Sequence, residues 1–528
     1  MSLNQVAGVS SRSLDLCNPG QIHLPKFPDL EVLSVEAASY ENYTFTPDPA
    51  LGDFPTSRLG LDFCNITITY THPGWGDNVI VTTLLPQKNA WNGRLMAHGG
   101  GGLATGAFTI MELTMLPGLV EGYAVTTTNG GHTDPPADDT SGDAPWALSS
   151  LGNVNWPLLV DFASVALHDL STVGKAVVDA FYGVPAVRSY FYGGSTGGRQ
   201  GHMLAQRYPN DFDGLLAIFP AIGWTRLLFS GIWPTFLMDK LNIYPQPCEI
   251  SALTLAALST CDVLDGVEDG IISRPDLCSF DPHDVVGNEF DCNGTTSTFT
   301  SGAATIAKAA WDGPRSSSGE FQWYGFSHDA NISQAGIGAA ATVCDEDGEN
   351  CDALPFNLAY TWARYWLKKN PDFNMRNITH EVWDELFHSS VGEYESIIGT
   401  YDPDLSGLRK AGGKMINWHG LADQIIPVNG SVEYYDRVLT HDPNAQDYYR
   451  LFLLPGADHC VICGVRPPVM KMMEILVDWV ERGKAPETLP VAGENRYGDH
   501  LERDVCMYPR VQHYVGGDME ERSSFICV

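Results

Sequence analysis

The residues Gly193-Gly194-Ser195-Thr196-Gly197 stand between a β-rich run at 190–192 and a helix-competent segment at 200–208. A strand that turns at once into a helix crowds the positions beside the serine, which is why Gly-x-Ser-x-Gly needs glycine there. The turn would expose the Ser195 hydroxyl at a helix N-terminus, where the Thr196 amide and the helix dipole favour negative charge on an attacked carbonyl oxygen. With 53 glycines in the chain, the motif alone is also compatible with a glycine-rich turn. The flanking strand and helix favour a nucleophile elbow.

A serine nucleophile needs a base, and the base needs a carboxylate that orients it. Asp423 directly follows an expected strand at 414–419, and His459 follows the next one at 448–454. Ends of neighbouring parallel strands meet at one sheet edge, and the chain order Ser, acid, His is that of α/β-hydrolases. The sequence therefore predicts a Ser195–His459–Asp423 triad. Asp458 is a weaker candidate for the acid, because adjacent side chains tend to diverge and it has no strand end of its own.

Four consecutive glycines, Gly99 to Gly102, follow an expected strand that ends at His98. Glycine lets backbone N–H groups face a ligand, and the pattern matches the His-Gly-Gly-Gly oxyanion motif of esterases. We expect the N–H groups of Gly101 and Thr196 to form the oxyanion hole, with Gly100 as the next candidate. A flexible turn is the alternative.

The elements around these residues alternate between strands and helices. The first ninety residues are β-rich, with strands expected at 66–70 and 78–85, and a further strand follows at 123–128. Residues 161–182 carry apolar side chains at helical spacing, and residues 213–219 form the next expected strand. This alternation predicts an α/β protein with a doubly wound, mostly parallel sheet, which is the α/β-hydrolase fold.

The alternation stops between residues 224 and 408, where Asp, Gly, Cys and Trp are frequent and helical runs are scattered, as at 358–367. It resumes at 414–419 and 448–454 and ends in an amphipathic helix at 469–482. Because 528 residues exceed the size at which single cores stop growing, we expect a large insertion. The predicted organisation is a catalytic domain in two parts, 1–223 and 409–528, with a lid domain at 224–408.

The composition limits the partners. A formal charge of −33 argues against binding to nucleic acid or to an anionic membrane, since both would repel the protein. Apolar runs stay shorter than the about 18 residues of a membrane span. We expect a small-molecule substrate, and the oligomeric state is left open.

Cysteines and glycosylation sequons indicate an oxidising export route. The chain has 12 cysteines and six Asn-x-Ser/Thr sequons, at Asn42, Asn65, Asn293, Asn331, Asn377 and Asn429. Disulfides persist in oxidising compartments, and sequons are glycosylated only on export. We therefore expect a secreted glycoprotein, although residues 1–13 lack the basic start and apolar run of a leader peptide.

Three carboxylates, on Asp262, Asp265 and Asp269, lie in a glycine-bent loop between Cys261 and Cys278. Clustered carboxylates suit a hard cation with six to eight oxygen ligands, which favours calcium over zinc. Backbone carbonyls of Val267 and Ile271 are suitable further ligands. A solvated acidic turn is the alternative.

The chain resembles the tannase and feruloyl esterase family of serine esterases over most of its length. The similarity is carried by the following segments: Trp91-Asn92-Gly93 with the glycine loop, Ala166-Leu167-His168-Asp169-Leu170 to Phe181-Tyr182-Gly183, Gly194-Ser195-Thr196-Gly197-Gly198-Arg199-Gln200, Gly420-Leu421-Ala422-Asp423 and Asp458-His459-Cys460. The resemblance implies that Ser195, Asp423 and His459 form the triad, that the lid shapes a pocket for an aromatic acyl group, and that the lid loop holds a structural calcium ion.

Sequence proximity and this resemblance together suggest four disulfides: Cys17–Cys64, Cys261–Cys278, Cys344–Cys351 and Cys506–Cys527. Cys248–Cys292 is the pair left over. In the family's usual pattern a cysteine directly before the serine is joined to the cysteine after the histidine, but this chain has Gly194 at the first position. Cys460 must then pair elsewhere, with Cys463 nearest, or stay free. We expect packing to hold the His459 loop.

The sequence therefore predicts a carboxylic ester hydrolase that acts on esters of hydroxycinnamic, galloyl or benzoic-type acids through an acyl-enzyme. An acyltransferase or peptidase would use the same triad. A catalytically silent protein that binds phenolics or glycans is the rival from another class.

Overall fold

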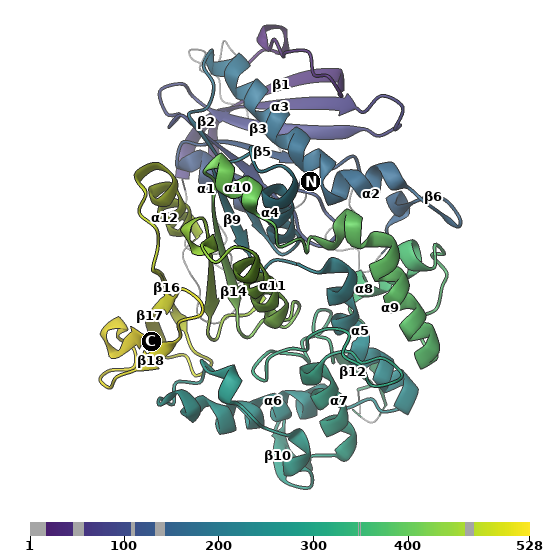
Figure 1. Cartoon of the computed structure of the whole chain (residues 1–528). Coiled ribbons are helices and arrows are strands. Elements are labelled where there is room, and N and C mark those ends of the chain that lie inside the picture. Colours follow the sequence, from purple (N-terminus) through teal and green to yellow (C-terminus); the bar gives the residue numbers. More distant parts are fainter. Residues whose placement is uncertain are drawn as a thin grey trace.

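A twisted sheet of nine strands forms the centre of the computed structural model, which describes residues 17–45, 58–106, 111–132, 143–346, 348, 350–459 and 469–528. The strand order is β1-β2-β3-β5-β4-β8-β9-β14-β15 (Figure 1). In this order the strands are β1 (Glu31–Phe45), β2 (Arg58–Thr71), β3 (Val79–Pro86), β5 (Ala124–Thr128), β4 (Arg94–His98), β8 (Arg188–Gly194), β9 (Gly214–Ile218), β14 (Lys414–Gly420) and β15 (Tyr449–Leu454). β1, β2, β3 and β5 pair antiparallel, and the pairs from β5 to β15 are parallel. The expected strands are confirmed, and the N-terminal ones form the sheet edge.

The parallel register brings several strand ends to one edge of the sheet. Gly194 at the end of β8 pairs with Ile218 of β9, Ile218 is level with Trp418 of β14, and Gly420 pairs with Leu454 of β15. The loops that follow β8, β9, β14 and β15 therefore leave the sheet at the same level. Ligands of open α/β sheets bind at this carboxyl edge.

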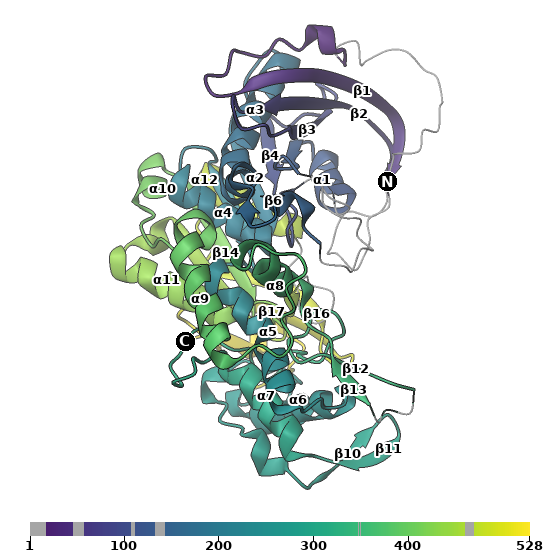
Figure 2. The same ribbon diagram turned by 90° about the vertical axis from the view of Figure 1, so that its right-hand side faces the viewer.

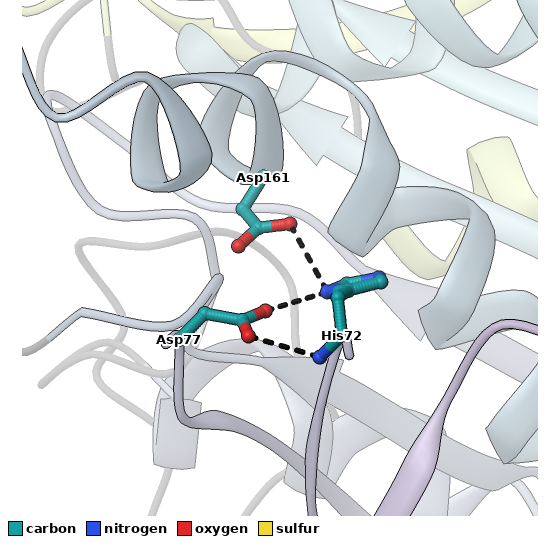
Figure 3. Close-up of side chains that lie close together, drawn as sticks. All are labelled: His72, Asp77 and Asp161. Atoms are coloured by element: carbon teal, nitrogen blue, oxygen red, sulfur yellow. Dashed lines mark hydrogen bonds and ion pairs between the residues drawn. The ribbon is translucent and has the colours of Figure 1, made fainter. Parts of the chain in front are cut away.

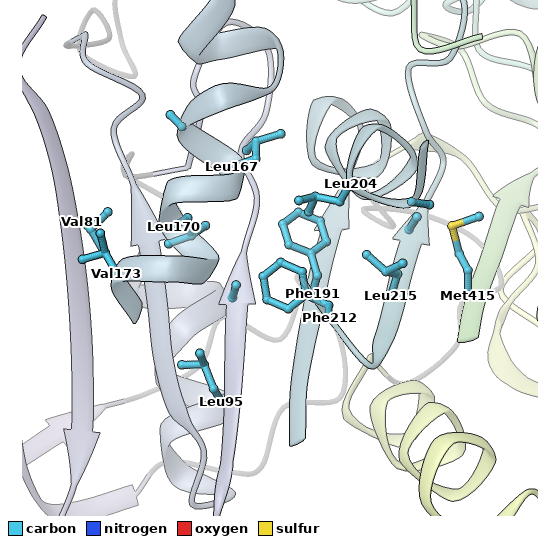
Figure 4. Packing of buried hydrophobic residues seen from close by; sticks show 14 of the residues in the cluster. Val81, Leu95, Leu167, Leu170, Val173, Phe191, Leu204, Phe212, Leu215 and Met415 are labelled. Carbon is cyan, nitrogen blue, oxygen red and sulfur yellow. The ribbon is translucent and has the colours of Figure 1, made fainter. Parts of the chain in front are cut away.

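Helices cover both faces of the sheet. On one face α3 (Val165–Tyr182), α4 (Thr196–Arg207) and α11 (Val428–His441) share a hydrophobic core with the strands. On the other face α1 (Met111–Val120) and α12 (Val469–Arg482) share a second core. Figure 4 shows side chains of α3, such as Leu170, over the strands that carry Val81 and Leu95. The arrangement is the doubly wound α/β-hydrolase fold that the sequence predicts.

The chain between β9 and β14 forms a largely helical insertion that lies below the carboxyl edge in Figures 1 and 2. Two hydrophobic cores hold it together: one rich in tryptophan, which it shares with residues 144–163, and one rich in alanine. Its longer elements are α5 (Trp224–Leu241), α6 (Pro247–Cys261), α7 (Ser301–Asp312), α8 (Asn357–Thr361), the π-helix η7 (Trp362–Leu367), α9 (His380–Tyr394) and α10 (Ser406–Ala411), with hairpins β10–β11 (Glu289–Cys292, Thr295–Thr298) and β12–β13 (Thr342–Cys344, Cys351–Ala353). The expected helical run at 358–367 corresponds to α8 and η7.

One helical stretch within the described residues, Pro247–Asp265, is long and apolar enough to cross a membrane, with a mean hydropathy of 1.3. Ile250, Leu253 and Ala257 of this stretch are buried in the core that it shares with α7. The packing inside the insertion explains the apolar character of the stretch, so its composition is weak evidence for a membrane span.

Two short hairpins follow α12, and the sequence pattern did not predict them. They are β16 (Thr488–Glu494) with β17 (His500–Cys506), and β18 (Gln512–Tyr514) with β19 (Phe525–Cys527). Arg503 of β17 reaches the insertion, where its Nη2 lies 3.1 Å from Asp269 Oδ2. The C-terminal hairpins therefore connect the catalytic domain to the insertion.

Five disulfides form within the described residues. They are the expected pairs Cys17–Cys64, Cys261–Cys278, Cys344–Cys351 and Cys506–Cys527, together with the remaining pair Cys248–Cys292. Cys460 and Cys463 lie outside the described residues.

The helix expected at 161–182 is two helices, α2 (Trp156–Ala163) and α3, separated at Ser164. Short strands β6 (Leu148–Ser150) and β7 (Asn153–Val154) precede α2. The carbonyls at the C-terminus of α2 have no partner within the helix, and the buried guanidinium of Arg199 donates to them, from Nη1 to Ala163 O and from Nη2 to Phe162 O at 3.0 Å each. Nη1 also donates to Thr400 Oγ1 of the insertion. The interruption lets one cation on α4 join α2 to the insertion.

Replacing Arg199 by methionine should destabilise the protein by about 2–5 kcal/mol, because buried carbonyls lose their donors. Differential scanning calorimetry measures the loss. Arg207, at the exposed end of the same helix, is the matched control, and Arg207→Met should cost less than about 1 kcal/mol. Equal losses for the two variants would contradict this role of Arg199.

Candidate active site

Ser195 stands in a strained turn between β8 and α4. Its φ of 60° and ψ of −121° lie outside the regions that non-glycine residues normally adopt. A Cβ on Gly193 would lie 2.5 Å from Gly197 O, and one on Gly197 would lie 2.9 Å from Gly100 O. The two motif glycines are therefore required by close backbone approach, and the predicted nucleophile elbow is present.

The three residues predicted as a triad lie together at the carboxyl edge. His459 Nε2 is 3.1 Å from Ser195 Oγ, and His459 Nδ1 is 2.8 Å from Asp423 Oδ2. The side chains of His459 and Asp423 are buried. The imidazole therefore bridges the hydroxyl and the carboxylate, and the Nδ1 contact is with Asp423, which the sequence favoured over Asp458.

Asp423 is held as an ionised acid by its surroundings. Its Oδ1 accepts hydrogen bonds from the backbone N–H groups of Ile425 and Ile426 at 2.8 Å each. Its Oδ2 also lies 3.1 Å from His419 Nε2. Burial alone would raise the pKa of Asp423, but the charge of His459 and hydrogen bonds from His419 and His459 bring this pKa well below its ordinary value. These contacts therefore favour the charged carboxylate.

His419 and Gln424 support the triad, and sequence reasoning missed both. His419 Nδ1 lies 2.9 Å from Ser431 Oγ, which fixes the ring beside Asp423. Gln424 Oε1 accepts the backbone N–H of His459 at 3.0 Å, and Gln424 Nε2 donates to Gln334 Oε1 of the insertion at 2.8 Å. The only signal in the sequence is the position of these residues around Asp423.

The glycine loop lies against the elbow, as the predicted oxyanion hole requires. Gly100 donates its N–H to Gln200 Oε1 at 3.0 Å, so this N–H already has an acceptor in the protein. Gly197 N donates to Gly100 O at 2.9 Å and Thr196 Oγ1 donates to Gly102 O at 2.7 Å, which holds Gly101 next to Thr196. Of the two glycines considered, the geometry favours Gly101.

Phe219, directly after β9, occupies the space between the elbow and the His459 loop. A Cβ on Gly194 would lie 2.7 Å from the Phe219 ring, so a cysteine could not stand at position 194 with this ring in place. The ring centroid is 4.6 Å from that of His459 and 5.2 Å from that of Trp418. Aromatic packing against His459 thus helps to hold the imidazole beside Ser195.

A narrow apolar pocket adjoins the nucleophile. The elbow supplies Ser195 and Thr196, and the loop after Asp423 supplies Ile425 and Ile426. The rest of the wall comes from Ala221, from α5 with Trp224, Leu227, Leu228 and Gly231, and from Phe356 and Leu358. The insertion therefore forms most of the pocket wall.

The acidic loop predicted to bind calcium is buried against the C-terminal hairpin. Asp262 accepts the backbone N–H groups of Asp269 and Gly270 at 3.2 and 2.8 Å, and Asp265 accepts that of Val267 at 3.1 Å. Asp269 contacts Arg503 through Oδ2, while its buried Oδ1 has no hydrogen-bond partner.

Burial raises the pKa of Asp262 and of Asp265. Burial and, next, the charge of Asp265 raise the pKa of Asp269 to about 7, against the attraction of Arg503. The three carboxylates repel one another, but their oxygens do not converge to within 4.8 Å as a set of three, so the loop would have to tighten around a hard cation.

The sheet order and the Ser195–His459–Asp423 geometry define an α/β-hydrolase with a serine nucleophile. The sequence profile of a family described as tannase and feruloyl esterase matches residues 64–528. The chain is 40% identical over 516 residues to a probable feruloyl esterase from Arthroderma benhamiae, covering 96% of this chain and 92% of that protein. It is 27% identical to a tannase from Aspergillus oryzae, with 89% and 86% covered.

Solved structures agree with the sequence comparisons. A tannin acyl hydrolase from Aspergillus niger superposes with a TM-score of 0.84 at 25% identity, covering 99% of this chain and 96% of that one. Feruloyl esterase B from Aspergillus oryzae superposes with a TM-score of 0.75 at 26% identity, covering 96% and 98%. The chain belongs to the tannase and feruloyl esterase family of carboxylic ester hydrolases.

Replacing Phe219 by alanine should lower kcat by roughly 10- to 100-fold, because the imidazole of His459 loses the ring that positions it. The loss of a buried ring should also cost about 3–5 kcal/mol of stability. Activity is measured at a temperature at which the variant is folded. Phe212→Ala, which removes a buried ring before β9, is the control and should lower stability while kcat is kept. A Phe219→Ala enzyme with unchanged kcat would show that the ring does not position the base.

Proposed function

We propose that this carboxylic ester hydrolase cleaves esters of aromatic acids, of the hydroxycinnamic, galloyl or benzoic type, through an acyl-enzyme on Ser195. The observation that carries the proposal is the contact chain Ser195–His459–Asp423 beside an apolar pocket. Relatives named feruloyl esterase and tannase support the class of acid.

The geometry supports a two-step reaction. His459 Nε2 takes the proton of Ser195 Oγ as this oxygen attacks the ester carbonyl carbon, and Asp423 stabilises the imidazolium. The N–H groups of Gly101 and Thr196 would receive the oxyanion. His459 then returns the proton to the leaving alcohol, and a water molecule activated by the same imidazole hydrolyses the acyl-enzyme.

The apolar pocket beside the nucleophile has a volume of only about 20 Å³, so it would have to widen to take the aromatic ring of the acyl group. Trp224 and Phe356 supply flat apolar surface, and the pocket begins at the nucleophile itself. Burial of an aromatic ring against such a wall provides binding energy without charge. A substrate panel of feruloyl, galloyl and benzoyl esters would rank the acids that the pocket accepts.

The rival functions differ in the acceptor or in the bond that is cleaved. An acyltransferase or a peptidase would use the same three residues, and comparison of matched ester and amide substrates, with and without an added alcohol acceptor, separates them. A silent binding protein is disfavoured by the intact hydrogen-bonded triad. Labelling with a fluorophosphonate probe distinguishes it directly.

Ser195→Ala should lower kcat for ester hydrolysis by about 10⁴- to 10⁶-fold, since removal of one triad member commonly has this effect. The Tm should stay close to that of the wild type. Ser189→Ala, at the other end of β8, is the matched control and should retain kcat. A Ser195→Ala enzyme that keeps more than about a tenth of the wild-type turnover would refute the assignment.

We also propose that Asp262, Asp265 and Asp269, with the backbone carbonyls of Val267 and Ile271, hold a structural calcium ion. Buried carboxylates and an unpartnered oxygen of Asp269 support the proposal. The ion would offset the repulsion among the carboxylates and stabilise the joint between the insertion and β17.

A chelator should lower the Tm, and added calcium should restore it. The rise in Tm on adding calcium should be larger near about pH 8 than near about pH 5. The direction of this pH dependence follows from Asp269, whose pKa in the folded, metal-free protein is raised to about 7. In the folded, metal-free protein Asp269 keeps a proton that the unfolded chain loses above about pH 4. The free energy of unfolding of the metal-free protein therefore falls as the pH rises towards 7. Calcium replaces this proton.

Differential scanning fluorimetry measures these increments. Asp269→Asn should reduce the calcium increment, whereas the exposed Asp276→Asn in the same loop should keep it. Purified protein that contains no calcium, and that shows no change in Tm when calcium is added, would disprove the site.

We further propose that the protein is secreted and glycosylated. The five disulfides support an oxidising compartment, and the six sequons supply acceptor sites.

A further inference from the structure

Four ionisable side chains lie buried together where β2 ends against α2 and α3, remote in sequence from the triad. His72 follows β2, Asp77 precedes β3, Asp161 belongs to α2 and Asp169 to α3. Neither the family's catalytic chemistry nor the proposed calcium loop uses these residues. Figure 3 shows the carboxylates of Asp77 and Asp161 directed at the imidazole of His72.

Three of these residues, His72, Asp77 and Asp161, each bring one side-chain nitrogen or oxygen atom close to those of the other two. His72 Nδ1 is 2.5 Å from Asp77 Oδ2 and 3.9 Å from Asp161 Oδ1. Nitrogen and carboxylate oxygens of the three residues all lie within 4.8 Å of one another. Asp77 is fixed in place because its Oδ1 accepts the backbone N–H of His72 at 2.9 Å and the hydroxyl of Thr71 at 2.7 Å.

Asp161 is the unusual member of the group. Its side chain is fully buried, and both carboxylate oxygens lack a hydrogen-bond partner. An ionised carboxylate out of water is costly unless a cation or several donors face it. The imidazole of His72 carries at most one positive charge, and it already faces Asp77 and Asp169. The group therefore has more negative charge than the protein itself compensates.

The other ring nitrogen of His72 has a separate partner. His72 Nε2 is 3.1 Å from Asp169 Oδ2, and Asp169 in turn accepts the hydroxyl of Tyr70 at 2.9 Å. A carboxylate behind the imidazole is the outer partner that fixes the tautomer of metal-binding histidines. In a metal-bound form, a proton kept on Nε2 would leave the lone pair of Nδ1 facing Asp77 and Asp161.

We propose that His72 Nδ1 and the carboxylates of Asp77 and Asp161 bind a divalent transition-metal ion of the zinc class, with Asp169 as the outer partner of His72. One imidazole with two carboxylates suits such an ion better than calcium or magnesium, which prefer all-oxygen sites. Zinc bonds of about 2.0–2.2 Å place tetrahedral ligand atoms about 3.3–3.5 Å apart. Asp161 would move closer to Nδ1, and Asp77 further from it.

The ion would tie the β2–β3 turn to α2. Binding requires Nδ1 to release its proton to solvent, so metal uptake is coupled to proton release. A proton is the competing occupant, because burial raises the pKa of Asp161 to about 8, against the opposing charge of His72 and with added repulsion from Asp77 and Asp169.

The test uses the full chain, stripped with a chelator and then saturated with calcium so that the lid loop is occupied. Zinc is titrated at neutral pH, bound metal is counted by inductively coupled plasma mass spectrometry, and Tm is recorded. The expected result is one zinc per chain and a higher Tm. No stoichiometric zinc, with no rise in Tm, would overturn the proposal and leave a proton as the occupant.

Variants show where the zinc binds. Asp169→Asn should weaken zinc binding by about 10- to 100-fold, and Asp161→Asn by more than that. Asp179→Asn, on the exposed face of α3, should leave zinc affinity unchanged. Each of these variants should keep the Tm increment from calcium. Equal zinc affinity in Asp161→Asn and the wild type would overturn the site.

The visible spectrum of bound cobalt tests the ligands on the wild-type chain, so no variant has to fold. Co²⁺ bound to the wild-type chain should show the intense visible bands of a four-coordinate nitrogen and oxygen site. A weak spectrum like that of hydrated Co²⁺ would contradict the proposed ligands.

Discussion

The active site depends on the close approach of two backbones, the turn that carries Ser195 and the glycine loop that follows β4. Gly197 and Gly100 are joined by a 2.9 Å hydrogen bond, and a Cβ on Gly99 would lie 2.8 Å from the Gly197 Cα. Any side chain at these positions would push the Ser195 turn away from the glycine loop. Gln200 reinforces the approach, because it accepts from Gly100 and donates to Thr105 O. The strained backbone of Ser195 is maintained by this contact.

The parallel register of the sheet extends this arrangement to the base and the acid. β8, β9, β14 and β15 end at one level, so the loops that carry Ser195, Phe219, Asp423 and His459 lie side by side. His459 depends on its neighbours for position. Asp423, Gln424 and the Phe219 ring each contact it. These contacts hold the imidazole beside Ser195.

Buried charged side chains lie where separate parts of the molecule meet. Arg199 joins α4 to α2 and to the insertion, and Arg503 joins the β16–β17 hairpin to the acidic loop. The group around His72 lies between the edge strands and α2. Such groups are costly unless every charge is matched, so they specify how the parts fit together. The chain has a formal charge of −33, and carboxylates collect at two of these joints.

The sequence by itself determined the fold class, the order of the elements and the identity of the three triad candidates. These features are local in the sequence. Glycine spacing, apolar periodicity and the position of Asp423 and His459 after strands are each visible in a short segment. Short-range disulfides such as Cys344–Cys351 were equally accessible. The break of the helix at Ser164, the packing of the Phe219 ring on His459 and the support from His419 and Gln424 were decided only by the tertiary structure. The same holds for the group formed by His72, Asp77, Asp161 and Asp169, whose members are up to 97 residues apart. Each of these features depends on contacts between side chains of segments that are distant in sequence. Such contacts produce no periodic pattern in the sequence, so they could not be predicted from it.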